Sequence, residues 1–282
     1  MLVFKKQVDL TAHLKTISSL KTTIGFVPTM GALHQGHVSL IKESILNNDL
    51  TVVSVFVNPT QFNNPDDLTN YPRTLEDDLI KIKNVSDKVL VYTPDVHDIY
   101  QGNTQSQHFD YDGLEFQMEG NFRPGHFDGV GTIVKRLFEI VKPTNAYFGE
   151  KDFQQLQIIK KLVFKQNIPV HVIGCPIFRE TNGLAMSSRN SRLTDAEKQT
   201  AAIIYETIQL AKTQFKTKSV LAISNWVSQK FQNIPNFTLE YFQIADEATL
   251  TPCLRKNKNK NYRAFIAVYV NNIRLIDTIS LN

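Results

Sequence analysis

Two histidines three residues apart, His34 and His37, follow a β-like run that stops at Pro28. At this spacing their imidazoles would share one face of a helix that began there. Gly31 and Gly36 allow close backbone approach to a ligand, and a helix N-terminus attracts anions. The pair could bind a metal, could be a structural pair satisfied by the backbone, or could hold a phosphate. A metal site would need further ligands, and the sequence has neither an H-E-x-x-H pattern nor a cysteine partner for it.

Two other segments carry cations suited to phosphate. In GEKD (149–152), Lys151 stands between two acidic residues, so either a surface ion pair or a point contact with phosphate is expected. Asp152 could bind ribose hydroxyls or help to hold Mg²⁺. In GLAMSSRNSRL (183–193), two serines and Arg189 form either a flexible loop or a mobile phosphate-binding loop.

Gln61 and Gln155 are neutral amides near a strand end and a helix start. Glutamines are common on protein surfaces, and that is the simplest interpretation of each. As a pair, however, they could orient a small hydroxylated acid without neutralising its carboxylate. The carboxylate would then remain a nucleophile.

Composition restricts the class of protein. The chain has 282 residues, is 42% apolar, and has a formal net charge of +4. This mild excess of positive charge is weak evidence for nucleic-acid binding. Cys175 and Cys253 are too few for a disulfide framework or a structural zinc site. With only this mild charge, we expect no nucleic-acid partner. Because the sequence shows neither a signal peptide nor an apolar run of about 18 residues, we expect no membrane partner and a cytoplasmic location.

The elements that must position these residues alternate along the first part of the chain. Such alternation predicts an α/β fold with a Rossmann-like, doubly wound parallel sheet, because parallel strands need crossover connections. A polar stretch at 102–126 is expected to be a functional loop region. The strands are expected at 23–29, 50–57, 88–93, 146–148 and 170–175, and the helices at 36–47, 74–86, 128–141 and 153–166.

The pattern changes after about residue 178. Thr194 and Glu197 form a capping box, which predicts a long helix to about Phe215, followed by a second helix at 219–232. Asn271 and Asn272 suit a tight hairpin between strands at 262–270 and 273–279. We therefore predict two domains, a Rossmann-like one at 1–178 and a smaller α+β domain at 179–282.

The unusual residues share one kind of position. The segments PTMGALHQGH, VFVNPTQF, GEKD and CPIFRE each lie at the end of a predicted strand. In an open parallel sheet, ligands bind beyond the carboxyl ends of the strands. The four segments are therefore expected to converge on one crevice.

Several stretches together carry a family resemblance. They are FVPTMGALHQGHVSLI (26–41), SVFVNPTQF (54–62), YPRTLEDDL (71–79), RPGHFDGVGTIVKRLF (123–138), AYFGEKDFQQL (146–156), GLAMSSRNSRL (183–193) and RLIDTI (274–279). In this array the sequence resembles the pantoate–β-alanine ligases, or pantothenate synthetases, of the H-x-G-H nucleotidyltransferase superfamily. The resemblance implies that ATP, pantoate and β-alanine give pantothenate, AMP and diphosphate through a pantoyl adenylate, a step of pantothenate and coenzyme A biosynthesis.

The resemblance also implies roles for single positions. The catalytic residues it implies are His37, the proton donor in the family's description, with His34, Lys151 and Arg189. The ATP site it implies consists of Met30, Gly31, Ala32, Leu33, His34, Gln35, Gly36, His37, Gly149, Glu150, Lys151, Asp152, Phe178, Met186, Ser187, Ser188 and Arg189. The pantoate site consists of Gln61, Gln155, Pro28, Met30 and Phe56, with Gln61 also meeting β-alanine, and Asn58, Tyr71, Arg123 and His126 are further candidates.

The family implies no protein-held metal, Mg²⁺ bound mainly through the ATP phosphates, and a homodimer. Two alternatives differ in class. One is an H-x-G-H nucleotidyltransferase that acts on a phosphorylated small molecule, which would not need the two acid-binding glutamines. The other is a non-catalytic nucleotide-binding protein, which would not require the set of His34, His37, Lys151 and Arg189.

Overall fold

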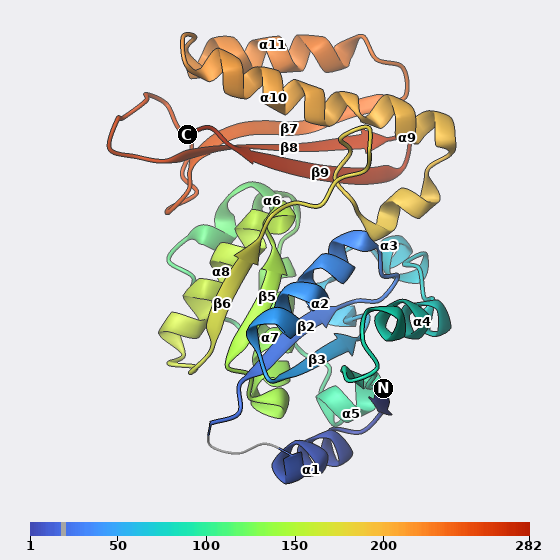
Figure 1. Ribbon diagram of the computed structural model, residues 1–282. Coiled ribbons are helices and arrows are strands. Elements are labelled where there is room, and N and C mark those ends of the chain that lie inside the picture. The colour runs from blue at the N-terminus through green and yellow to red at the C-terminus, as the bar shows by residue number, and fades with distance from the viewer. Residues whose placement is uncertain (18–20) are drawn as a thin grey trace.

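The computed structural model describes residues 1–17 and 21–282, and in these residues the strands form one parallel and one antiparallel sheet (Figure 1). The parallel strands are β1 Leu2–Phe4, β2 Ile24–Thr29, β3 Leu50–Val55, β4 Leu90–Tyr92, β5 Asn145–Gly149 and β6 His171–Cys175. The antiparallel strands are β7 Phe237–Asp246, β8 Tyr262–Val270 and β9 Ile273–Ser280. The predicted fold class, a doubly wound parallel sheet with a smaller C-terminal α+β part, is confirmed.

The parallel sheet has the strand order β1-β4-β3-β2-β5-β6. The chain runs outward from β2 through β3 to β4 and then returns to the opposite side of β2 as β5. In the register, Ile24 of β2 lies opposite Leu50 of β3, and Gly25 of β2 lies opposite Asn145 of β5. The strand order therefore reverses between β2 and β5, where an open α/β sheet leaves a crevice for ligands. The segments after Thr29 and after Gly149 border this crevice.

Helices cover both faces of the parallel sheet (Figure 1). The helices of this part are α1 Gln7–Ile17, α2 Gln35–Asn47, α3 Pro65–Thr69, α4 Leu75–Val85, α5 Val96–Tyr100, α6 Met118–Phe122, α7 His126–Val141 and α8 Phe153–Lys165, with 3-10 turns η1 Pro59–Gln61, η2 Leu114–Phe116 and η3 Glu150–Asp152. One apolar cluster joins the sheet to α2 and α4, and a larger cluster joins the opposite face to α1, α7 and α8.

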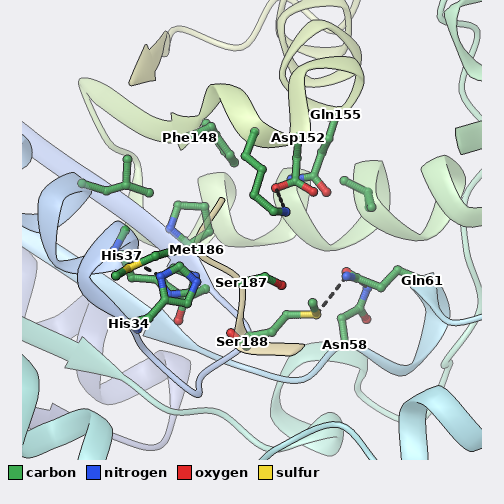
Figure 2. Close-up of a pocket in the computed structure, with 18 of the residues that line it drawn as sticks. His34, His37, Asn58, Gln61, Phe148, Asp152, Gln155, Met186, Ser187 and Ser188 are labelled. Atoms are coloured by element: carbon green, nitrogen blue, oxygen red, sulfur yellow. Dashed lines mark hydrogen bonds and ion pairs between the residues drawn. The ribbon is translucent and has the colours of Figure 1, made fainter. Parts of the chain in front are cut away.

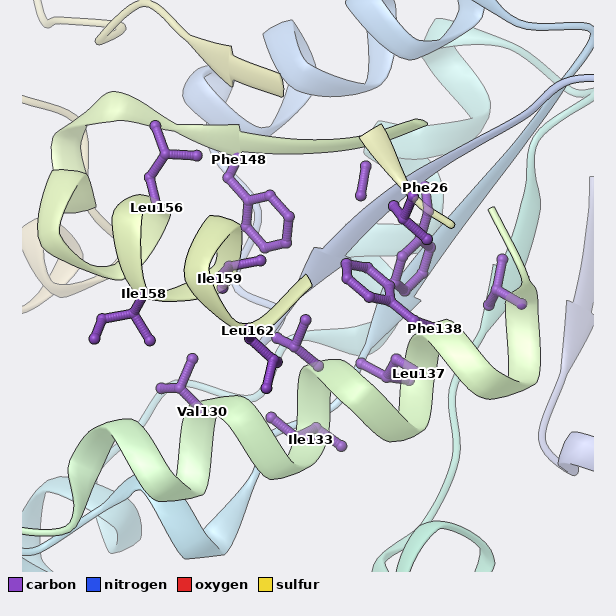
Figure 3. Packing of buried hydrophobic residues seen from close by; sticks show 14 of the residues in the cluster. Phe26, Val130, Ile133, Leu137, Phe138, Phe148, Leu156, Ile158, Ile159 and Leu162 are labelled. Atoms are coloured by element: carbon purple, nitrogen blue, oxygen red, sulfur yellow. The ribbon is translucent and has the colours of Figure 1, made fainter. Parts of the chain in front are cut away.

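The packing of α7 and α8 on the sheet fixes the floor of the crevice (Figure 3). Val130, Ile133 and Leu137 recur at helical spacing on α7 and are each at most 5% exposed. Phe148 of β5 and Ile159 of α8 belong to the same cluster. Because interiors of this kind are close-packed, this cluster holds α7 and α8 in place against the sheet.

The smaller sheet is covered by two helices on one face (Figure 1). The C-terminal helices are α9 Asp195–Ala201, α10 Ile203–Phe215 and α11 Val220–Gln232, with the 3-10 turn η4 Ser188–Arg192. The capping box of Thr194 and Glu197 is confirmed, but the single long helix is wrong. Asn182 donates its side-chain amide to the carbonyl of Lys198, the acceptor that Ala202 would use in a continuous helix, and Ala202 bonds instead to Gln199.

Other parts of the first region differ from expectation. The polar stretch at 102–126 is not simply a loop, because it contains η2 and α6 and buries Phe109, Tyr111, Leu114 and Met118 in the main core. Gly131 of α7 explains this packing, since a Cβ there would lie 2.0 Å from the hydroxyl of Tyr111. The strand β1 and the helices α1, α3 and α5 are additions to the predicted elements. No helix in residues 1–17 or 21–282 combines the length and the apolar character that crossing a bilayer requires.

Charged pairs join the small sheet to the larger part. Arg274 of β9 contacts both carboxylate oxygens of Glu119 in α6, at 2.7 and 2.8 Å. The hydroxyl of Tyr241 in β7 donates to the same carboxylate at 2.6 Å. Arg263 of β8 likewise pairs with Glu150 of η3 at 3.3 Å, and within residues 179–282 Arg179 donates to Asp277 of β9 at 2.6 Å, where Asp277 is 3% exposed. Charges buried to this degree are tolerated where several hydrogen bonds satisfy them, as here.

Candidate active site

The histidine pair lies at the N-terminus of α2, where backbone contacts fix both rings. His34 is the N-cap, and its Nδ1 accepts from the backbone N–H of Gly36 at 3.1 Å. Nδ1 of His37 accepts from the backbone N–H of His34 at 3.3 Å. In a neutral imidazole whose Nδ1 accepts, the proton is on Nε2. Both rings therefore have an Nε2–H group left to donate.

The surroundings keep both rings neutral. Burial, followed by the neighbouring His37 and Lys151, lowers the pKa of His34 from 6.5 to about 2. Burial and then Lys151 lower the pKa of His37 to about 4, although Asp152 acts in the opposite direction. The ring centroids are 4.1 Å apart. A Cβ at Gly36 would lie 2.8 Å from the His34 ring, so a glycine is needed there for this arrangement.

A buried carboxylate that the sequence analysis did not single out holds the loop before the histidines. Asp78 of α4 is fully buried and accepts from the backbone N–H groups of Ala32 at 2.9 Å and Leu33 at 2.7 Å. Gly31 in this loop has φ +83°, a conformation that glycine adopts without strain. Asp78 falls on the buried face of the predicted helix with Ile82, and an acidic residue at such a position was the available signal.

Two cations border the crevice near the histidines. Lys151 lies in η3, directly after β5, and its Nζ is 3.1 Å from Asp152. Arg189 of η4 pairs with Asp67 of α3, with Nη2 2.6 Å from Oδ2. Partial burial opposes ionisation of Asp67, but the Arg189 pair outweighs it and lowers the pKa of that carboxyl. The hydroxyl of Ser188 donates to the carbonyl of Ala32 at 2.9 Å, which ties η4 to the histidine loop.

The glutamines lie away from the histidine pair (Figure 2). Gln61 ends η1 and is 9% exposed, and its Nε2 is 2.9 Å from the sulfur of Met30. Nδ1 of buried His126 contacts the backbone carbonyl of Gln61 at 2.8 Å. Figure 2 shows Gln155 beside Asp152, where both side chains border the same space.

These groups surround one cavity of about 220 Å³. Its lining includes the following predicted site residues: Pro28, Met30, His34, Gly36, His37, Phe56, Asn58, Gln61, Tyr71, Gly149, Lys151, Asp152, Gln155, Phe178, Met186, Ser187, Ser188 and Arg189. The expected convergence of the four strand ends is thus observed.

Other predicted residues lie beside this cavity. Leu33 packs in the apolar cluster under α2, and Ala32 and Gly31 form the loop that Asp78 holds. Gln35 is the first residue of α2. The carboxylate of Glu150 pairs with Arg263 of β8 at 3.3 Å. Arg123 and His126 border a smaller pocket that shares Lys151, Asp152 and Gln155 with the main cavity.

The apolar wall of the cavity was missed by the sequence analysis. It comes largely from α7, through Val130, Ile133, Val134 and Leu137. Twelve of the 16 residues of α7 are buried, so periodicity alone did not separate the cavity-facing positions from those in the core. Gly129 brings this wall close to η1, because a Cβ there would lie 2.3 Å from the carbonyl oxygen of Thr60.

The fold and the cavity define a Rossmann-like enzyme of the H-x-G-H type, with its histidine motif at the switch point of the sheet. The pantoate-beta-alanine ligase family model matches residues 2–280. The pantothenate synthetase of Flavobacterium psychrophilum is 64% identical over the full length of both chains. That of Christiangramia forsetii is 50% identical, again over the full length of both.

Solved structures agree with the sequence comparison. The pantothenate synthetase of Thermus thermophilus superposes with a TM-score of 0.90 at 34% identity, covering 100% of this chain and 99% of the other. The pantoate-beta-alanine ligase of Francisella tularensis, complexed with beta-gamma ATP and beta-alanine, gives a TM-score of 0.81 at 34% identity, covering 100% and 98%. The chain belongs to the pantoate-beta-alanine ligase family and is an enzyme of that family.

Proposed function

We propose that this enzyme condenses pantoate with β-alanine in two steps that consume ATP, giving pantothenate, AMP and diphosphate. The observation that carries the proposal is the composition of one cavity in a chain of this family. Phosphate-binding groups stand at one part of the cavity, and neutral amides suited to a hydroxy acid stand at another. A transferase acting on a phosphorylated acceptor would not need this amide pair.

In the first step, a pantoate carboxylate oxygen attacks the α-phosphorus of ATP, and the bond from that phosphorus to the bridging oxygen of diphosphate breaks. Gln61 and Gln155 orient the acid, and Pro28, Met30 and Phe56 contact its methyl groups. Amides leave the carboxylate charged and therefore nucleophilic. Lys151 and Arg189, with Ser187 and Ser188, hold the phosphates as negative charge moves onto the leaving diphosphate.

His34 and His37 donate hydrogen bonds from Nε2 to phosphate oxygens in this step. The contacts at Nδ1 and the lowered pKa values support neutral donors in the ligand-free enzyme. A nearby phosphate shifts each pKa upward, because an opposite charge favours the imidazolium. His37 thus begins the reaction as a donor already held in place, and such preorganised donors are effective where charge develops.

In the second step, the uncharged amine of β-alanine attacks the carbonyl carbon of the pantoyl adenylate. The carbon–nitrogen bond forms, the bond from the carbonyl carbon to AMP breaks, and a proton of the amine passes to the phosphate oxygen of the departing AMP. Adenylation is needed because a free carboxylate is a poor acyl donor, whereas AMP is a good leaving group. Gln61 borders the cavity in which both acids meet.

Mg²⁺ fits this cavity as part of the ATP substrate. Mg²⁺ usually keeps several waters and binds one or two carboxylates together with substrate phosphates. Within residues 1–17 and 21–282 the acidic and histidine side chains form no cluster of three or more suited to a metal. Asp152 is the carboxylate that borders the cavity and could meet a phosphate-bound ion. The ion neutralises phosphate charge, while the protein residues orient the reacting groups.

We further propose that residues 1–178 form the domain that binds ATP and pantoate, and that residues 179–282 form a lid. The segment from Met186 to Arg189 belongs to the second range and borders a cavity lined otherwise by residues of the first range, which supports this division. Residues Gly31 to Gln35, Gly149, Glu150 and Phe178 complete the ATP site around the groups named above. The enzyme is also proposed to act in the cytoplasm and as a homodimer.

Exchange of labelled pyrophosphate into ATP tests the proposal. Exchange that depends on pantoate and proceeds without β-alanine is expected, because the first step is complete in itself. Addition of β-alanine should then convert the adenylate to pantothenate. Exchange supported by a phosphorylated acceptor and not by pantoate would establish the nucleotidyltransferase alternative instead.

A further inference from the structure

Tyr100 lies outside the cavity and yet touches the residues that hold Gln61. It ends α5 and is 1% exposed. Its hydroxyl donates to Oδ1 of Asn58 at 2.5 Å and lies 2.9 Å from the hydroxyl of Thr60. The hydroxyl of Thr60 is also 3.2 Å from the same oxygen of Asn58. Two hydroxyl groups therefore converge on the amide oxygen of Asn58.

The opposite end of the Asn58 amide faces acceptors. Its Nδ2 donates to the backbone carbonyl of Gly129 in α7 at 3.2 Å and to Oε1 of Gln61 at 3.2 Å. A backbone carbonyl can only accept, so the nitrogen of Asn58 must face α7 and its oxygen must face Tyr100. Asn58 is 1% exposed, which shields these hydrogen bonds from competition with water.

The orientation of Asn58 determines that of Gln61. Because the Gln61 oxygen accepts from Asn58, its Nε2 points the other way, toward the sulfur of Met30 at 2.9 Å and the cavity (Figure 2). A thioether sulfur is a weak acceptor, so the Gln61 N–H groups keep most of their capacity for a ligand. Gln61 is thus set to donate to an oxygen of a bound acid rather than to accept from it.

We propose that Tyr100 is a positioning residue for acid binding, acting through Asn58 to keep the Gln61 N–H groups directed at pantoate. The inference rests on the proposed function of the cavity. Removal of the Tyr100 hydroxyl leaves the Asn58 oxygen with Thr60 as its remaining hydroxyl partner. The Asn58 and Gln61 amides then rotate more freely. Pantoate binding has to order them, and its binding free energy becomes less favourable.

The test is Tyr100→Phe, which keeps the ring and its contact with Arg136. Loss of one neutral hydrogen bond of ordinary strength should raise the dissociation constant of pantoate by about three- to tenfold, as measured by calorimetry. The KM for ATP in the exchange assay should stay within about twofold of the wild-type value. In a Gln61→Ala background the substitution should have no further effect on pantoate affinity, because the residue through which it acts is gone.

Tyr147→Phe is the matched control. Tyr147 is also 1% exposed, and its hydroxyl accepts from Asn48 at 2.8 Å, away from the cavity lining. Tyr147→Phe should lower the melting temperature about as much as Tyr100→Phe does, while it leaves the affinity for pantoate unchanged. If Tyr100→Phe does not fold, Thr60→Val at a partly exposed position removes the second hydroxyl and should weaken pantoate binding in the same direction.

Three outcomes would overturn the inference: unchanged pantoate affinity in a folded Tyr100→Phe variant, an equal loss of affinity in the Gln61→Ala background, or a parallel rise in the KM for ATP. A wild-type enzyme that neither binds pantoate nor exchanges pyrophosphate in its presence would instead refute the proposed function. The two failures are therefore distinguishable.

Discussion

His37→Ala separates the cost to chemistry from the cost to folding. The substitution removes one preorganised donor at the reacting phosphate, and such donors contribute about 10²–10³-fold to kcat. It also removes the acceptor for the backbone N–H of His34, a capping contact at 3.3 Å. Loss of a helix N-cap contact costs about 0.5–2 kcal/mol of unfolding free energy. We therefore expect a folded enzyme that turns over at least a hundred times more slowly, on the order of that donor contribution.

His37→Gln distinguishes a hydrogen-bond donor from a proton donor. Its side-chain amide can donate but cannot supply a proton, and one neutral hydrogen bond of about 1.4 kcal/mol corresponds to roughly tenfold in rate. We expect His37→Gln to be faster than His37→Ala by at least this factor. A glutamine variant as slow as the alanine variant would indicate proton transfer.

Pantoate-dependent pyrophosphate exchange measures the first step alone, and urea unfolding measures stability. His171→Ala provides the control, because His171 is an exposed residue of the edge strand β6 and should leave both quantities near wild type. Wild-type exchange in a folded His37→Ala variant would refute the role of His37. A loss of exchange that matched the fraction of unfolded protein would refute it as well.

Three further perturbations follow from the geometry. Asp78→Asn loses one of the two charge-assisted hydrogen bonds that hold the histidine loop, so the unfolding free energy should fall by about 1.5–3 kcal/mol and the KM for ATP should rise; unchanged values of both would contradict the anchoring role. Asp67→Asn removes the carboxylate that occupies Arg189, so the KM for ATP should fall by about two- to fivefold in the exchange assay, and a higher KM would show that the pair positions Arg189 instead. Burial and then Arg123 lower the pKa of His126 to about 3, and the two motif histidines are lowered to about 2 and about 4, so the unfolded chain binds more protons. The free energy of unfolding should therefore have its full value above about pH 6.5. As the pH drops toward 4, it should fall by about 1.4 kcal/mol per pH unit for each of these rings that stays neutral in the folded protein. A free energy of unfolding that did not change with pH in urea unfolding would contradict these lowered pKa values.

Local signals were sufficient for much of this protein. The period of the apolar residues located the strands that carry the site, and the histidine motif, GEKD and Gln61 were found because each follows a strand. Since parallel strands end at one edge of the sheet, sequence position alone predicted that these segments would meet. The capping box of Thr194 and Glu197 was equally local, because it depends on residues within one helical turn.

Other features depended on partners distant in the chain. The break between α9 and α10 comes from Asn182, which takes the carbonyl of Lys198, and a propensity argument includes no such competitor. The core positions of Phe109 and Tyr111 depend on the close approach that Gly131 permits. The polar residues around them in the sequence therefore predicted a loop rather than buried side chains.

The residue types of the site were determined by the sequence, but their chemical states were decided by the tertiary structure. Nδ1 of His37 accepts from the backbone N–H of His34, and this contact leaves Nε2 as the nitrogen that can donate. The lowered pKa of His37 depends on burial and on Lys151. The direction of the Gln61 amide depends on Asn58, and through it on Tyr100 of α5. Hydrogen-bond direction and desolvation arise from surrounding groups in three dimensions, and those groups are brought together only when the chain has folded.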